Sequence, residues 1–299
     1  MHDGDDRRGD DGAPRLRAAL SAPSTPPLPR GDIVPVPTLE AELLGAIWKA
    51  PDDREALSVY ADWLIEHGDA TRGEYIHLGL LEKPTAAQKK RRTALQNRHR
   101  GAWLGAARRF VWTWTESDET PGFVARVQCS MPKLAAGFEQ VRMLGPRLYV
   151  SVSEPKAKRE VVALAARPLG TLWGLCFFEN DAQWISDEVL EILAPSLDGL
   201  RALVLHPGGA RSSDRGWRAL LPHLSQLEHL ELTLGDHPEA WLEALVAPGA
   251  APRLRRLSLP GWIDPSMKAR LSQTFPGCAI DFRRERRSRF DRATGYYVP

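Results

Sequence analysis

Side chains that could do chemistry recur at a regular spacing in the second half of the chain. Cys176, His206, His229 and Glu231 are of the types that bind zinc or act as nucleophile and base. If strands stack with a period of 27 residues, all four face one surface. Cys176 then stands two strands from His229, roughly 9–10 Å away, which is too far for a shared metal ion or a proton transfer. We therefore expect no catalytic residue, metal or cofactor there.

Motifs of known enzyme classes do not appear in the sequence. It contains no GxxxxGK[ST] phosphate loop, GxSxG elbow, HExxH or DxDxDG. Gly208 and Gly209 follow a predicted strand, but their GGARSSD context lacks a phosphate-binding lysine. Cys129, Cys176 and Cys278 have neither metal-ligand spacing nor a disulfide pattern, which favours a reducing cytoplasm. The sequence predicts a cytoplasmic protein that is not an enzyme.

A leucine template positions these side chains. Four segments share the form L-x-x-L-x-L or a near relative: LWGLCF (172–177), LRALVL (200–205), LEHLEL (227–232) and LRRLSL (254–259). Their second leucines are Leu175, Leu203, Leu230 and Leu257, at intervals of 28, 27 and 27 residues, and RLYVSV (147–152) puts Leu148 another 27 residues upstream. Amphipathic helical segments lie between them. This predicts stacked strand–helix units with parallel strands on a concave face and helices on a convex face.

The template resembles leucine-rich repeats of the ribonuclease-inhibitor type. An ordinary α/β domain also alternates strands and helices, but it need not keep one interval. The asparagine that usually follows the strand in such repeats is missing, since His206, Thr233 and Pro260 stand there. The resemblance implies an α/β fold with a short repeat solenoid over residues 109–282.

Alternation along the strands puts three rows of side chains on the concave face. The rows are Gly174, Ala202, His229 and Arg256, then Cys176, Val204, Glu231 and Ser258, then Phe178, His206, Thr233 and Pro260. Because curved solenoids bind through such surfaces, we expect the partner-binding residues to be Phe178, Val204, His206, His229, Glu231 and Arg256.

A small all-α domain is predicted over residues 38–108, where apolar residues recur at helical spacing. Its run VYADWLIEHGDATRGEYIHL (59–78) resembles the bacterial repeat-companion domain, with Asp69-Ala70-Thr71 replacing the usual Asp-Pro. The resemblance implies a module that precedes repeat arrays, and it carries no activity. We expect Trp63 to be structural and Asp62 to pair with Arg72, locking the second helix against the third. A catalytic role for Asp62 is the alternative, but no second titratable group accompanies it.

The termini and the charge balance set the remaining expectations. Residues 1–37 are rich in proline and predict a disordered tail, without a signal peptide, and residues 283–299 form a basic, tyrosine-containing tail. The net charge is +2, from 40 Lys and Arg against 38 Asp and Glu, which predicts no whole-molecule attraction to nucleic acid or membranes. No apolar run is long enough to span a membrane.

Two functions follow from these observations. The first is a protein–protein interaction module, used as a scaffold or as a regulatory or inhibitory subunit, with a partner that the sequence does not identify. The alternative is a nucleic-acid-associated protein that uses the basic segments 89–100 (KKRRTALQNRHR) and 283–292 (RRERRSRFDR).

Overall fold

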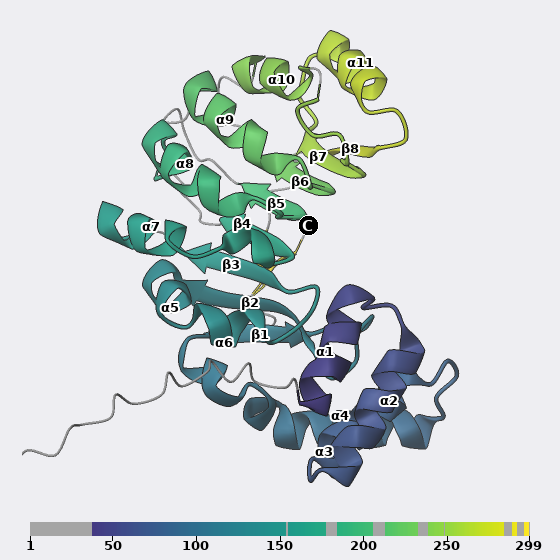
Figure 1. Ribbon diagram of the computed structural model, residues 1–299. Helices are drawn as coiled ribbons and strands as arrows, with labels where there is room; N and C mark the ends of the chain where they lie inside the picture. The colour runs from purple at the N-terminus through teal and green to yellow at the C-terminus, as the bar shows by residue number, and fades with distance from the viewer. Residues whose placement is uncertain are drawn as a thin grey trace, which may run out of the picture. The chain divides into compact units, whose positions relative to one another are not determined.

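The structure is a computed structural model that describes residues 38–153, 155–177, 184–205, 213–232, 239–247, 249–283, 289–291 and 296–298. The predicted tail, residues 1–37, lies outside them. From Thr38 onward the chain forms one compact unit of mixed α/β structure (Figure 1). The predicted boundary near residue 108 falls at the end of a 3-10 helix, Gly105–Arg109, after which the first strand begins.

Four helices come first, and their ends follow the capping residues. They are α1 (Leu39–Lys49), α2 (Arg54–Glu66), α3 (Ala70–Leu80) and α4 (Ala86–Trp103). The Thr38 hydroxyl accepts from the Ala41 amide, and the Asp53 carboxylate accepts from the first turn of α2. Thr85 and Gln88 form a capping box at α4.

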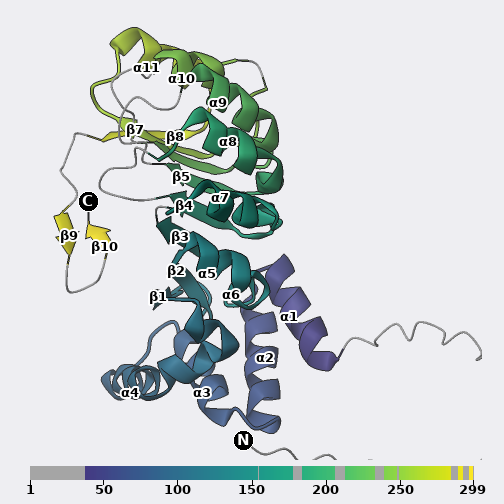
Figure 2. The same cartoon turned by 90° about the vertical axis from the view of Figure 1, so that its left-hand side faces the viewer.

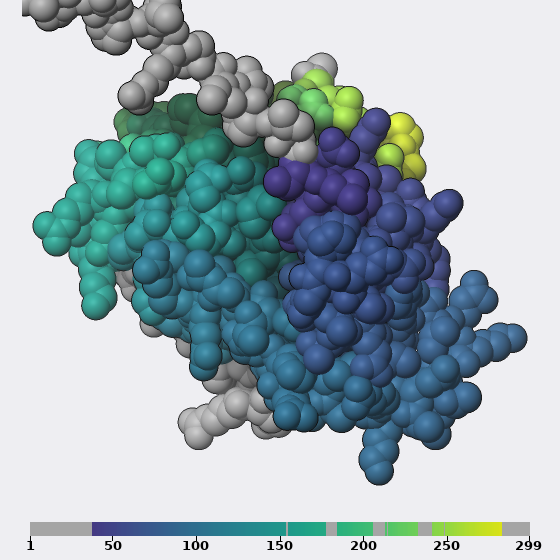
Figure 3. Space-filling view, turned by 60° about the horizontal axis from the view of Figure 1, so that its bottom comes forward, coloured from purple at the N-terminus to yellow at the C-terminus, as the bar shows by residue number. Residues whose placement is uncertain are grey.

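One aromatic side chain from beyond the helices completes their core. Ile47, Leu57, Tyr60, Ala61, Leu64 and Ile76 form a buried cluster together with Phe123, which lies just before the second strand. The ring of Phe123 meets Trp48 edge-on at 5.5 Å and stacks on Tyr60 at 5.9 Å between centroids. The helices therefore share a core with the start of the sheet, and Figure 3 shows their purple and blue surface lying directly against the teal surface of the residues that follow.

Eight strands form a single sheet in chain order. The first pair is antiparallel and every other neighbouring pair is parallel. Helices α5 and α7–α10 form a layer on one face of the sheet, α6 follows α5 directly, and α11 lies beside the last strands (Figures 1 and 2). The strands are β1 (Thr113–Glu116), β2 (Val124–Ser130), β3 (Tyr149–Ser153), β4 (Gly174–Phe177), β5 (Ala202–Leu205), β6 (His229–Leu232), β7 (Arg256–Pro260) and β8 (Ala279–Arg283). The helices between them are α5 (Met131–Ala136), α6 (Phe138–Arg142), α7 (Lys158–Ala165), α8 (Asp187–Leu193), α9 (Asp214–Leu220), α10 (Glu239–Leu245) and α11 (Pro265–Thr274). Beyond β8, β9 (Arg289–Asp291) and β10 (Tyr296–Val298) pair only with each other.

The strand register confirms the central leucine alignment. Leu175 pairs with Leu203, which pairs with Leu230, and Leu230 pairs with Leu257. All four are at most 2% exposed and face the helix layer, where each buried leucine contributes roughly 1.5–3 kcal/mol.

The predicted position of Leu148 is wrong by two residues. Val150, not Leu148, pairs with Leu175, so this interval is 25 residues instead of 27. A two-residue shift keeps every side chain on the same face, and the apolar pattern therefore cannot distinguish the two registers.

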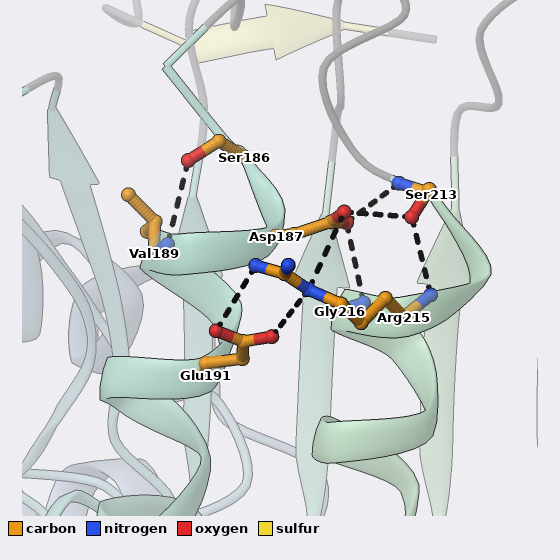
Figure 4. A network of polar contacts seen from close by, with 7 residues as sticks. All are labelled: Ser186, Asp187, Val189, Glu191, Ser213, Arg215 and Gly216. Atoms are coloured by element: carbon orange, nitrogen blue, oxygen red, sulfur yellow. Dashed lines mark hydrogen bonds and ion pairs between the residues drawn. The ribbon is translucent and has the colours of Figure 1, made fainter.

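A carboxylate links consecutive helices of the helix layer. Asp187, in the first turn of α8, accepts hydrogen bonds from the Ser213 amide and hydroxyl and from the Gly216 amide at the start of α9 (Figure 4). Arg215 ion-pairs with Glu191 at 2.7 Å. Burial raises the pKa of Asp187, but these hydrogen bonds outweigh it and hold the pKa below its usual value. Asp187 thus caps the next unit's helix from outside it.

Substituting Asp187→Ala should lower the free energy of unfolding by about 1–2 kcal/mol, because the N-cap Ser213 and the Gly216 amide of α9 lose their acceptor. Since the pKa of Asp187 is lower in the folded protein, its stabilisation is present at neutral pH and is lost as pH falls through that pKa. Urea unfolding between about pH 7 and pH 3 measures both effects. The control is Glu188→Ala, which removes only an exposed pair with Lys158 and should change stability by less than about 1 kcal/mol. Equal losses from both substitutions would contradict the capping role.

Candidate functional site

The sheet face opposite the helix layer, which we call the helix-free face, carries two complete rows of side chains. No helix within the described ranges covers it (Figure 2). The first row is Arg126, Tyr149, Gly174, Ala202, His229, Arg256 and Ala279, and the second is Gln128, Ser151, Cys176, Val204, Glu231, Ser258 and Asp281. The register thus brings Val204, His229, Glu231 and Arg256 onto one face, as predicted. Phe178 and His206 lie outside the described residues.

Three aromatic rings form the centre of the helix-free face. Tyr149 meets Trp173 edge-on at 4.7 Å, and Trp173 meets His229 edge-on at 5.3 Å between centroids. The Tyr149 hydroxyl lies 3.4 Å from His229 Nδ1. Tyr149 belongs to β3 and His229 to β6, so the tyrosine side chain extends over the two strands between them. We call Tyr149, Trp173 and His229 the aromatic platform.

Small residues beneath Tyr149 allow this arrangement. A Cβ atom at Gly174 would lie 2.5 Å from the Tyr149 ring, closer than real contacts allow. Ala202, the next residue in the row, is the smallest side chain after glycine. Glycine inside a strand often marks such a close approach, and this was the sequence signal for a large side chain lying over the row.

Two members of the aromatic platform escaped the sequence prediction. Tyr149 was missed because the predicted rows were not extended to the strand before β4, although the predicted register also puts Tyr149 on this face. Trp173 was missed because it precedes β4, where strict alternation puts it on the helix side. The amides of both Arg201 and Ala202 bond to the Trp173 carbonyl, which breaks the regular ladder, and the indole lies beside Tyr149 and His229.

Burial and cations keep the platform groups in fixed protonation states. The Arg126 guanidinium lies 5.5 Å over the Tyr149 ring. Burial raises the pKa of Tyr149 to about 12, so the phenol keeps its proton. Burial, followed by Arg256, lowers the pKa of His229, which favours the neutral imidazole beside the Tyr149 hydroxyl. The platform is uncharged, with arginines near it.

Cys176 belongs to the second row of the helix-free face, and its thiol is not activated as a nucleophile. Burial raises the pKa of its thiol to about 12, although the Ser151 hydroxyl and Arg126 favour the thiolate. Among the residues that the structure describes, no three His, Cys, Asp or Glu side chains gather as a metal site. No helix in the same part of the chain is long and apolar enough to cross a membrane.

The predicted pair of Asp62 and Arg72 does not form. The Asp62 carboxylate lies 2.9 Å from His77 Nε2, while Arg72 donates to the Gly122 carbonyl at 3.1 Å and lies over Phe123. His77 and Arg72 are five residues apart on α3, or about 140° around the helix, so Asp62 cannot contact both sides. Arg72 instead holds α3 to the segment that enters β2.

Trp63 lies against the core of the helices. Its ring stacks on Tyr60 at 6.1 Å and on His67 at 4.4 Å between centroids. It packs against the buried cluster of the helices and is itself partly buried. These contacts link successive turns of α2 to its C-terminal end.

Much of the basic segment 89–100 is engaged inside the protein. Arg91 forms a two-pronged pair with Glu74 at 2.8 and 2.7 Å. Arg92 lies 5.0 Å over the Tyr75 ring, and Arg100 lies 5.0 Å over Trp114. Lys89, Lys90 and Arg98 are the basic side chains of this segment without such a contact among the described residues. The other basic segment, 283–292, lies mostly outside the described residues.

A cleft of about 390 Å³ lies between the helices and the first strands. Its walls include Trp103, Trp114 and Phe123, with Arg72 and Glu116 as charged members. Tyr75 donates a hydrogen bond to Glu116, and burial raises the pKa of this carboxyl group. Four buried polar atoms at this junction have no hydrogen-bond partner among the described residues: Arg72 Nε, Arg92 Nε, Glu116 Oε1 and Thr120 Oγ1. The junction is thus polar, and burial of Glu116 there carries an electrostatic cost.

Replacing Glu116→Gln should stabilise the protein at pH 7. Burial raises the pKa of Glu116 in the folded protein. The ionised carboxylate therefore destabilises the protein as pH rises through this raised pKa. At lower pH the group is protonated and the destabilisation is absent. Glutamine still accepts from Tyr75 and carries no charge. Melting temperatures of wild type and variant should therefore differ at pH 7 and converge near pH 4. Glu82→Gln, at an exposed position of the same module, should show no such convergence. A destabilised Glu116→Gln protein at pH 7 would refute this.

Comparison of the chain with protein-family models, with curated proteins and with solved structures finds no match. The functional argument therefore rests on the geometry of the helix-free face and of the cleft.

Proposed function

We propose that this chain is a non-enzymatic binding protein, a scaffold or regulatory subunit that binds a protein partner through the helix-free face. Its architecture, in this proposal, is a leucine-rich-repeat solenoid of the ribonuclease-inhibitor type preceded by a repeat-companion module. The observation that carries it is the preformed aromatic platform of Tyr149, Trp173 and His229 at the centre of that face.

The composition of this face matches the energetic centres of protein interfaces. Tryptophan, tyrosine and arginine dominate such centres, where a few well-packed residues supply most of the binding energy. Here Tyr149 and Trp173 lie between Arg126 and Arg256 of the first row. The rings already contact one another, so less conformational entropy is lost when a partner covers them.

The helices α1–α4 support the solenoid by covering its first strands. A repeat array exposes its apolar core at each end unless another element covers it. Phe123 joins the two cores, and Arg147, just before β3, pairs with Asp52 of the helical segment and with Glu119. This favours a supporting role for the helical module and leaves the helix-free face for binding.

Nucleic-acid binding is the weaker alternative. It depends on exposed cations that can follow a phosphate backbone. In the segment 89–100, however, Arg91, Arg92 and Arg100 already contact Glu74, Tyr75 and Trp114.

Affinity capture from a lysate of the source organism tests the proposal. The full chain should retain specific proteins, and Tyr149→Ala or Trp173→Ala should reduce their recovery by at least about tenfold, as truncation of a central interface aromatic does. Quantitative mass spectrometry gives the recovery, and circular dichroism shows that each variant is folded.

The matched control is Trp262→Ala, because Trp262 is 47% exposed and lies beyond the far end of β7. Recovery should be unchanged by this substitution. If both platform variants retain the same proteins as the wild type, binding does not use this face.

A further inference from the structure

Two arginines beside the aromatic platform have no partner within the described part of the protein. Arg256 is the first residue of β7 and pairs in register with His229, and Arg255 precedes it. Both side chains are exposed, and neither forms a hydrogen bond or an ion pair with a described residue. They are the cations on this face whose charge nothing described compensates.

The other charged groups near the platform are already engaged. Arg201 pairs with Glu228 at 3.5 Å. Arg126 lies over the Tyr149 ring, and Glu231 and Asp281 of the second row each have a polar contact. Arg255 and Arg256 are therefore the described cations beside the platform with which a partner's carboxylates can pair, and the carboxylates Glu231 and Asp281 lie in the next row.

The two arginines act on the platform at close range. The Arg255 amide bonds to the Glu228 carbonyl, next to His229, and Arg256 is the in-register neighbour of His229 itself. Burial, and after it these two cations, lowers the pKa of His229, in keeping with their position beside the imidazole. A ligand that touches His229 and Trp173 consequently also feels Arg255 and Arg256.

We infer that the helix-free face recognises an acidic protein segment, whose carboxylates pair with Arg255 and Arg256 and whose adjacent apolar or aromatic side chain packs on Trp173 and Tyr149. This inference rests on the proposed function and specifies the chemistry of the partner. Guanidinium groups bind carboxylates with two parallel hydrogen bonds, and complementary charge selects the partner and speeds its association.

A polypeptide fits this face better than a nucleic acid does. A phosphate backbone is uniformly negative and needs a continuous basic track. On this face, Glu231 lies one row from Arg256 and Asp281 lies on the next strand. These carboxylates repel a uniform polyanion, whereas a peptide can place its few carboxylates at the arginines alone.

Selection from a random 12-residue peptide library displayed on phage tests the inference. The immobilised full chain retains peptides, and clones that also bind the folded Trp173→Ala variant are discarded. The remaining peptides should be enriched in Asp and Glu next to an aromatic or aliphatic residue. Enrichment in Lys and Arg, absence of any charge preference, or no remaining clone would overturn the inference.

Charge reversal of the two arginines provides the second measurement. The double variant Arg255→Glu, Arg256→Glu should bind the selected fluorescein-labelled peptides at least about tenfold more weakly in fluorescence anisotropy, with a reduced dependence on salt. The control is Arg159→Glu, Arg167→Glu, because these arginines are exposed on the opposite side, at α7, and should have no effect. A labelled 20-nucleotide single strand serves as a competitor. If it binds and the double variant abolishes its binding but not that of the peptides, the site belongs to nucleic acid.

The experiments distinguish a failure of the acidic-partner inference from a failure of the proposed binding function. If proteins captured from the lysate depend on Trp173 but not on Arg255 and Arg256, the partner is not acidic and the proposed function still holds. If capture is independent of Trp173, the proposed function itself fails at this face.

Discussion

The whole sheet depends on parallel strands that repeat in register. A single strand–helix unit cannot bury its apolar side alone, so each unit packs its leucine against the equivalent residue of the next. Leu175, Leu203, Leu230 and Leu257 form this continuous row on the helix side. The same register aligns the rows on the opposite face, which means that the core and the candidate binding surface are two consequences of one alignment. A substitution that shifted one strand would disturb both.

Spacing is uniform only in the middle of the sheet. Val127 and Val150 are 23 residues apart and Leu257 and Ile280 are also 23 apart, against 27 or 28 in the centre. The first short unit is also the one that packs on the helices through Phe123. The polar junction around Glu116 lies there, with four buried atoms that lack partners among the described residues. The units at the two ends of the sheet thus differ from the central ones, and the junction carries an electrostatic cost.

The sequence predicted most of the central sheet and part of the candidate site, for reasons that particular residues make clear. A leucine template with constant intervals determines which residues are neighbours, so His229, Glu231 and Arg256 were aligned correctly. It could not decide between Leu148 and Val150, because both face the helices. Either choice leaves Tyr149 on the opposite face, but only the observed register aligns it with Gly174 and His229. Trp173 depends on an irregular pair of backbone hydrogen bonds that no side-chain pattern encodes. The expected Asp62–Arg72 pair failed because the rotation of α3 about its axis follows from how α3 packs, and the spacing of these residues does not determine it.

The side chain of Tyr149 has a mechanical consequence. A sheet of stacked strand–helix units bends and twists when neighbouring units rotate slightly relative to one another. Tyr149 starts on β3, passes over Gly174 of β4 and Ala202 of β5, and reaches His229 on β6. A rotation between any two of these strands would change the distance from the hydroxyl to the imidazole. This side chain therefore links four neighbouring strands, β3 to β6, and opposes a rotation between any two of them.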